Sequence, residues 1–197
     1  TLPRTRRGEV DCLPPDLIGE LAPVHARSPQ ITVAVPIVAY VGERVRTMIA
    51  GSGIETILVE DEGETFDAFA ASEAALAKSG TVTLELALSG VPAIIAYKVN
   101  ALSYAIAIRI ANFKYAGLPN LILDRPLLPE FLQADCRPGA LAAGLARLLD
   151  DPEARAAQIA GMAEIRSLLS GPAGTPSAAA ADVVLKLIDA QRFAMGT

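Results

Sequence analysis

Residues 74 to 99 read AALAKSGTVTLELALSGVPAIIAYKV, and this stretch determines the predicted fold. Ala74–Lys78 has the pattern of a short apolar strand, and Val82–Leu88 has a helical pattern that stops at Gly90. Pro92–Val99 is a second strand pattern, rich in β-branched and aromatic residues. A strand, a helix and a second strand in this order predict a crossover connection and therefore a parallel sheet.

The same alternation extends to both sides of this stretch. Further strand patterns lie at Ile31–Val38 and Thr56–Glu60. Helical patterns lie at Glu9–His25, Gly42–Ala50, Glu64–Ala71, Ala101–Ala111, Gly139–Leu149, Glu153–Leu169 and Ser177–Arg192, with a long polar loop from Asn112 to about Pro129. This alternation predicts an α/β fold, a Rossmann-like parallel sheet with helices on both faces and additional C-terminal helices. We expect one domain over residues 1–197, a length that suits a single such unit.

The composition argues against several classes of protein. Hydrophobic residues make up 52% of the 197-residue chain and charged residues 20%, which favours a folded core over disorder. No apolar run reaches the ~18 residues of a membrane-spanning helix. The formal net charge of -5 argues against nucleic acid as a partner. Cys12 and Cys136 form no metal or redox motif, so we expect no metal, no cofactor and a reducing, cytoplasmic location.

Polar residues follow the Ala74–Lys78 strand directly, at Ser79-Gly80-Thr81. In open parallel sheets, ligands bind outside the carboxyl ends of the strands. Gly80 lets a ligand approach the backbone, and the amides at the start of the following helix favour an anion such as a diphosphate. Glu85 lies one turn further along, where a carboxylate could accept both hydroxyls of a ribose. The alternative is an ordinary strand–helix turn with Glu85 on a solvated face.

Other polar segments are predicted at the same edge of the sheet. Arg6 precedes the first helix, where its guanidinium could bind phosphate oxygens or simply face solvent. Asn120, and Glu130 with Gln133, lie within and after the long loop, where they could shape a pocket, cap a turn or remain surface groups. No catalytic residue is identified, because His25 has no Ser, Cys or Asp motif beside it and the sequence has no P-loop, GxGxxG, HExxH or zinc spacing.

Taken in order, these segments resemble the lipid-A-disaccharide synthase family. The resemblance is carried by Leu-Pro-x-x-Arg-Arg-Gly-Glu-Val over residues 2–10, Ser79-Gly80-Thr81-x-Thr83-Leu84-Glu85, Gly90-Val91-Pro92 leading to Tyr97, Leu118-Pro119-Asn120-Leu121, and Pro129-Glu130-x-Leu132-Gln133. It runs from about Leu2 into the C-terminal helix. The Ser-Gly-Thr, Leu-Pro-Asn and Glu-x-x-Gln elements are specific when they occur together.

The resemblance implies the C-terminal, nucleotide-sugar-binding half of a GT-B glycosyltransferase, with the N-terminal acceptor domain outside this chain. It implies a hexosyltransferase that moves 2,3-diacylglucosamine from its UDP derivative to 2,3-diacylglucosamine 1-phosphate (lipid X), giving lipid A disaccharide and UDP. The implied substrate-binding residues are Arg6, Ser79, Gly80, Thr81, Glu85, Asn120, Glu130 and Gln133. The implied location is cytoplasmic, with the inner-membrane surface and a second copy of the chain as further contacts to test.

Two features depart from the family. Arg4-Thr5 stands where most members have Gly-Ser, which puts a large side chain where backbone should approach phosphate. Without the acceptor domain and its catalytic base, we expect the chain alone to be inactive and at most to bind nucleotide. Two alternatives stay open: an enzyme similar to UDP-N-acetylglucosamine 2-epimerase, which shares the fold, and a truncated, non-catalytic nucleotide-binding or interaction module.

Overall fold

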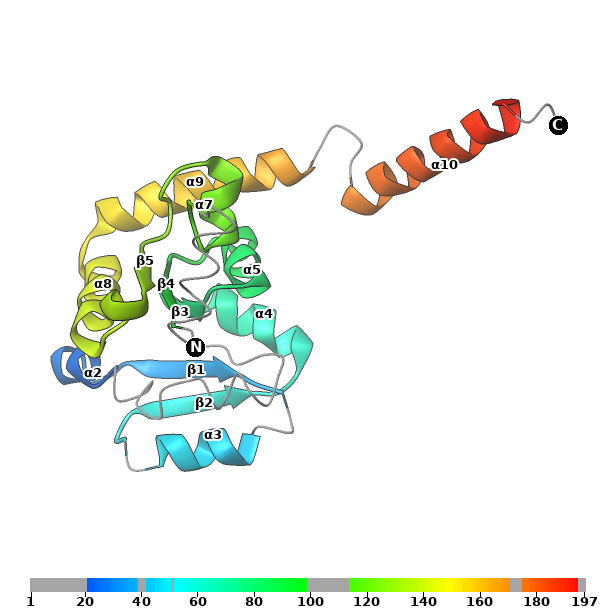
Figure 1. Cartoon of the computed structure of the whole chain (residues 1–197). Helices are drawn as coiled ribbons and strands as arrows, with labels where there is room; N and C mark the ends of the chain where they lie inside the picture. Colours follow the sequence, from blue (N-terminus) through cyan, green and yellow to red (C-terminus); the bar gives the residue numbers. More distant parts are fainter. Residues whose placement is uncertain (1–20, 39–41, 51, 99–113, 171–174, 195–197) are drawn as a thin grey trace.

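The structure, a computed structural model, describes residues 21–38, 42–50, 52–98, 114–170 and 175–194. Strands alternate with helices over most of this length (Figure 1). The strands are β1 (Thr32–Pro36), β2 (Glu55–Val59), β3 (Ala75–Lys78), β4 (Ala93–Tyr97) and β5 (Glu130–Leu132). The helices are α2 (Ala22–Arg27), α3 (Gly42–Ile49), α4 (Glu62–Ala70), α5 (Thr81–Ser89), α7 (Leu118–Leu123), α8 (Pro138–Asp150), α9 (Pro152–Ser170) and α10 (Pro176–Ala194), with a 3₁₀ turn η3 (Gln133–Asp135).

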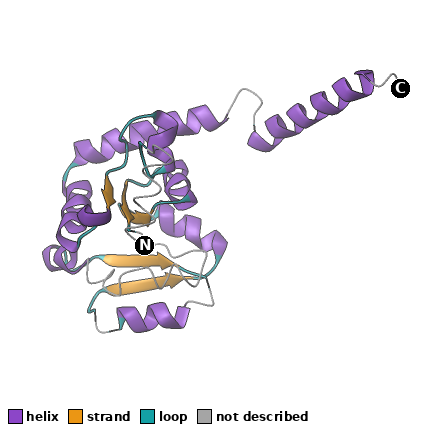
Figure 2. Cartoon of the chain, in the orientation of Figure 1, coloured by secondary structure: helices purple, strands orange, loops and turns teal. Residues whose placement is uncertain are grey.

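The strands form two parallel sheets. β1 pairs with β2, with Thr32 opposite Glu55. The second sheet has the order β3-β4-β5, with Ala75 opposite Ala93. Figure 2 shows the strands at the centre with helices around them. This arrangement confirms the α/β fold and the parallel sheet that the sequence predicts.

Alternate residues of β3 and β4 face opposite layers of helices. Leu76 and Ile94 belong to a buried cluster with residues of α2 and α8. Ala77 and Ile95 belong to a second cluster with residues of α5 and α9. Because successive side chains of a strand point to opposite faces, the β3-β4-β5 sheet is covered on both sides, as predicted. Each fully buried Leu or Ile here contributes ~1.5–3 kcal/mol to stability through its removal from water.

The core beside α8 also reaches the first sheet. Val33 of β1 packs against the cluster that contains Leu76 and Ile94, and so does Ile31 just before that strand. Ile54, just before β2, is a buried member of the same cluster. The two sheets therefore belong to one folded unit, although β1 and β3 are not paired with each other.

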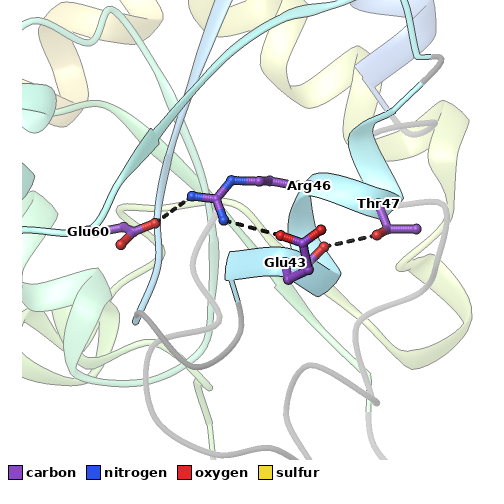
Figure 3. A network of polar contacts seen from close by, with 4 residues as sticks. All are labelled: Glu43, Arg46, Thr47 and Glu60. Carbon is purple, nitrogen blue, oxygen red and sulfur yellow. Dashed lines mark hydrogen bonds and ion pairs between the residues drawn. The ribbon is translucent and has the colours of Figure 1, made fainter.

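A polar network fastens α3 to the end of β2 (Figure 3). Arg46 reaches across from the helix, and its Nη2 lies 2.8 Å from Oε1 of Glu60. Its Nη1 lies 3.5 Å from a carboxylate oxygen of Glu43, and the hydroxyl of Thr47 donates to the Glu43 carbonyl oxygen at 2.9 Å. Because these side chains are largely exposed to solvent, each ion pair contributes no more than about 1 kcal/mol.

The long loop predicted from Asn112 to about Pro129 is wrong in one respect, since it contains the helix α7. The strand β5 was also not expected. α7 has only six residues and carries a proline at its second position, and β5 has three residues that begin with a glutamate. Neither segment is long enough to show a helical or strand periodicity. The predicted Ala101–Ala111 helix and most of Glu9–His25 lie outside the described residues.

α10 extends away from the rest of the molecule (Figure 1). It carries exposed large apolar side chains, namely Val183, Val184, Leu185, Leu187 and Ile188. Within the part of the chain that the structure describes, no helix combines the length and the apolar character needed to cross a membrane.

Candidate functional site

A glycine turn follows β3 at the carboxyl edge of its sheet. Gly80 has φ 151° and ψ -169°, a combination that is essentially restricted to glycine. A Cβ atom at this position would meet nothing within 4 Å, so the backbone conformation and not the available space requires a glycine. Gly80 and Thr81 are both exposed. The turn therefore faces solvent in a conformation that few other residues could adopt.

The turn leads into the N-terminus of α5. Gly80 is the N-cap and supplies no side-chain acceptor. Thr83 is fully buried, and its hydroxyl donates to the carbonyl oxygen of Gly80 at 2.8 Å. This bond fixes the turn from the side of the protein core. The first N–H groups of a helix have no intrahelical acceptor and lie at the positive end of its dipole. The exposed start of α5 can therefore bind an anion.

Ser79 connects this turn to the segment before α7. Its hydroxyl donates to the carbonyl oxygen of Ala116 at 2.6 Å. The amide nitrogens of Ala116 and Gly117 donate to the two carboxylate oxygens of Glu130 at 2.8 and 2.9 Å. A Cβ on Gly117 would lie 2.2 Å from Cδ1 of the buried Ile95, so a larger residue here would require the Ile95 side chain to move. Residues 116 and 117 are thus held between the end of β3 and the start of β5.

Asn120 is the buried centre of the same region, with 0% of its surface exposed. Its Oδ1 accepts from the amides of Leu127 and Leu128 at 2.9 and 2.8 Å. Its Nδ2 donates to the carbonyl oxygen of Leu128 and to Oε1 of Glu130, both at 2.8 Å. These four bonds use the full hydrogen-bonding capacity of the side chain. Asn120 therefore fixes the path of the chain from α7 to β5.

An ion pair closes the outer end of this segment. Nζ of Lys114 lies 2.7 Å from Oδ1 of Asp124, the residue that ends α7 with φ 49°. The hydrogen bond that the Lys114 ammonium donates to the Asp124 carboxylate raises the pKa of Lys114 above its ordinary value. Both side chains are exposed, so this pair adds little to stability in solution.

The register of the sheet places Gly80, Lys98 and Gln133 at about the same position along three neighbouring strands. Tyr97 pairs with Leu132, and Lys78 pairs with Ala96. One or two residues beyond these pairs, Gly80, Lys98 and Gln133 lie at the carboxyl edge of β3, β4 and β5. Lys98 is exposed, and Gln133 has φ 49°, which is unusual for a residue other than glycine.

The structure brings most of the predicted site residues together. Ser79, Gly80 and Thr81 form the turn, and Ser79 is joined through Ala116 to Glu130 and Asn120. Glu85 is half-buried on α5, four residues after Thr81 and therefore on the same side of the helix. Gln133 lies on the same edge after β5. Arg6, and the Arg4-Thr5 pair that departs from the family, lie outside the described residues.

Sequence reasoning missed three residues of this region. Ala116 and Gly117 act through backbone atoms, so only the glycine could have pointed to a close approach. Lys98 was not singled out, because the predicted strand Pro92–Val99 includes it, and only the structure, which ends β4 at Tyr97, places this charge at the end of a strand.

Parallel strands, connecting helices and a glycine turn before a helix N-terminus define a Rossmann-like α/β domain. A family model described as lipid-A-disaccharide synthetase matches residues 1–181. The chain belongs to this family.

Curated relatives agree with this assignment. A lipid-A-disaccharide synthase of Rhodospirillum centenum is 44% identical over 187 residues, which cover 95% of this chain and 47% of the relative. Proteins of the same name from Gluconobacter oxydans and Paramagnetospirillum magneticum are 35% and 39% identical, each over 95% of this chain and over 45% and 48% of their own lengths. The chain thus spans about half the length of the curated relatives it matches.

Proposed function

We propose that this chain is the donor-binding half of a glycosyltransferase that transfers 2,3-diacylglucosamine from its UDP derivative to lipid X, giving lipid A disaccharide and UDP. Membership of the family supports this proposal and disfavours the alternative of a 2-epimerase. The observation that carries it is the exposed N-terminus of α5 behind the Gly80 turn. A diphosphate is the part of a UDP-sugar that suits such a helix terminus.

In the proposed complex, the diphosphate lies against the turn at Gly80 and Thr81. Its charge is matched by the amides of α5 and by two cations, Arg6 and Lys98. Lys98 supports this arrangement because it is exposed at the same level of the sheet edge as Gly80. Good stabilisation of the departing UDP by these fixed groups would be the contribution of this half to catalysis.

Glu85 is proposed to bind the ribose. It lies one helical turn below Thr81 on the same side of α5, so a nucleoside attached to the diphosphate could follow the helix toward it. Its carboxylate is a suitable acceptor for two neighbouring hydroxyls.

Asn120 and Glu130 are proposed to act as positioning residues for this site. Their polar atoms hold the segment from Ala116 to Leu128, and Ser79 couples that segment to the glycine turn. They would therefore shape the donor pocket through the backbone. Gln133 is proposed to line the same pocket from the end of β5.

The acceptor site and the catalytic base are proposed to lie in the half of the longer protein that this chain does not span. The chain alone should then bind nucleotide without transferring sugar. We also propose a cytoplasmic location with contact to the inner membrane, supported by the exposed apolar residues of α10. Co-sedimentation with anionic vesicles tests the membrane contact, and light scattering tests the alternative use of this surface in a homodimer.

Calorimetry with UDP and UMP tests the site. For this experiment the chain is fused to the upstream half of the Rhodospirillum centenum relative, which under this proposal would supply the acceptor domain. UDP should bind at least about tenfold more tightly than UMP, since the second phosphate gains hydrogen bonds to charged or dipolar groups. Equal affinities for the two nucleotides would remove the diphosphate site from the proposal.

Variants of the same fusion separate the roles of individual residues. Glu85→Gln should weaken UDP about 10–100-fold and should reduce the preference for ribose over deoxyribose. Glu73→Gln is the matched control, because Glu73 is exposed before β3, at the opposite end of that strand, and should leave binding unchanged. Equal effects of the two changes would mean that Glu85 does not contact the nucleotide.

A further inference from the structure

Thr83 is the one polar residue on the buried face of α5. The buried residues of this helix are Val82, Thr83, Leu86 and Ala87, and Thr83 is 0% exposed. Valine has nearly the same shape as threonine and would bring no hydroxyl into the core, where an unpaired hydroxyl is costly. Buried polar groups have hydrogen-bond partners, so the partner of this hydroxyl indicates what it does.

The hydroxyl of Thr83 is bonded to the turn that precedes the helix. Its Oγ1 donates to the carbonyl oxygen of Gly80 at 2.8 Å, and the Thr83 amide donates to the same oxygen at 3.2 Å. Threonines in helices often bond to a carbonyl three or four residues back, so the bond by itself does not indicate a function. Its consequence depends on what else holds Gly80.

The peptide group between Gly80 and Thr81 has few other restraints within the described residues. A glycine has no side chain to restrict its backbone, and a Cβ at Gly80 would meet no atom within 4 Å. Gly80 also provides no side-chain hydrogen bond that caps the helix. The hydroxyl of Ser79 holds the preceding residue to Ala116. Thr83 thus supplies the side-chain contact that fixes the carbonyl group of Gly80.

The start of α4 is built differently. Asp61 is the N-cap there, and its carboxylate accepts from the amides of Gly63 and Glu64 at 2.7 and 3.2 Å. Thr65 is only 4% exposed, and its hydroxyl donates to the carbonyl oxygen of Asp61 at 3.0 Å. The same threonine bond therefore occurs at the start of both helices. In α4 the amides of the first turn are satisfied by the chain itself, whereas the N-cap of α5 has no such acceptor.

The direction of the Gly80 carbonyl determines the direction of the next amide. The peptide bonds of the described residues are trans, and the C=O and N–H groups of a trans peptide point in opposite directions. Because the carbonyl oxygen of Gly80 is held toward the buried Thr83, the N–H of Thr81 is directed away from the core. Thr81 is exposed, so this amide faces the side from which an anion could approach.

We propose that Thr83 is a positioning residue for the diphosphate. Through the carbonyl group of Gly80, it holds the amide of Thr81 in the direction that binds the anion. This inference rests on the proposed function and adds to it a buried residue that does not contact the nucleotide. Without the hydroxyl, the peptide group can adopt other orientations, and the affinity for the diphosphate falls in proportion to the fraction that remains correctly oriented.

The ratio of the UMP to the UDP dissociation constant measures this role, because effects on uridine binding cancel in it. Calorimetry gives both constants in the fusion to the upstream half of the Rhodospirillum centenum relative. Thr83→Val keeps the volume and removes the hydroxyl, so it should reduce the ratio about fivefold, the factor that corresponds to one net hydrogen bond. Thr83→Ser loses a buried methyl but keeps the hydroxyl, so it should lower stability to a similar extent and retain the ratio. Thr65→Val is the matched control at α4 and should also leave the ratio unchanged.

The outcomes separate this proposal from the proposed function. If the unsubstituted fusion prefers UDP and Thr83→Val keeps the full ratio, the positioning role is overturned and the diphosphate site stands. Equal losses in Thr83→Val and Thr83→Ser, or the same loss in Thr65→Val, would assign the effect to packing at a helix start and would also overturn it. If the unsubstituted fusion does not prefer UDP, both proposals fail. If circular dichroism shows that Thr83→Val does not fold, Thr83→Ala takes its place and should show the same reduced ratio.

Discussion

Replacing Asn120 by aspartate should destabilise the protein by about 3–5 kcal/mol at neutral pH. The change keeps the size of the side chain and the oxygen that accepts from Leu127 and Leu128. It replaces Nδ2, which donates to the Leu128 carbonyl and to Glu130, by an oxygen that can only accept. The lost bond to the charged Glu130 costs about 1.5–3 kcal/mol and the lost bond to the carbonyl about 1 kcal/mol, and repulsion between two carboxylates adds to both.

Urea unfolding followed by circular dichroism measures this loss as a lower midpoint at an unchanged slope. Burial and the neighbouring Glu130 should raise the pKa of the introduced carboxyl above its value in the unfolded chain. A raised pKa in the folded state makes an acid more favourable at low pH, so the deficit of the variant should shrink as the pH falls through that raised pKa. Glu130→Gln in the same background should recover at least about 1 kcal/mol. A deficit below about 1 kcal/mol, or one independent of pH, would refute the network around Asn120.

Three other changes test separate contacts by the same unfolding assay. Gly117→Ala should cost about 1–3 kcal/mol, because its Cβ would lie 2.2 Å from Cδ1 of the buried Ile95, and no loss would show that the Ile95 side chain can move aside. Thr83→Val keeps the buried volume but loses the hydroxyl bond to Gly80, so it should cost about 1 kcal/mol, and a stabilised variant would contradict that bond. Arg46→Met should change stability by less than about 1 kcal/mol, because its ion pairs are exposed, and a larger loss would mean that the α3 network is more than a surface contact.

The β3-α5-β4 unit was predictable from the sequence because each of its parts carries a local signal. The strand at Pro92–Val99 is apolar and β-branched, the helix ends at Gly90, and the turn contains a glycine. All three signals act within a few residues, and tertiary contacts only reinforce them. The structure gives β3 the bounds Ala75–Lys78, within one residue of the prediction.

The segment from Ala116 to Leu132 was not predictable in the same way. α7 and β5 are defined by contacts between distant residues, such as Gly117 with Glu130 and Asn120 with Leu128. A three-residue strand has no period of its own, and its pairing with β4 is decided by the core around Ile95. The sequence correctly placed Asn120 and Glu130 at the carboxyl edge of the sheet. It could not reveal that their polar atoms bond to other groups of the protein.

The candidate site therefore consists of two sets of residues. Substitutions in the two sets should affect the stability of the fold differently. The polar atoms of Ser79, Asn120 and Glu130 bond to other groups of the protein, and each broken bond leaves a buried or half-buried group without that partner. Thr81 and Lys98 are exposed at the sheet edge. Substitutions in the first set should weaken folding and ligand binding together, because they affect the ligand only by changing the position of the backbone. Substitutions in the second set should weaken binding alone. Measuring both quantities for each variant thus distinguishes residues that build the pocket from residues that touch what it binds.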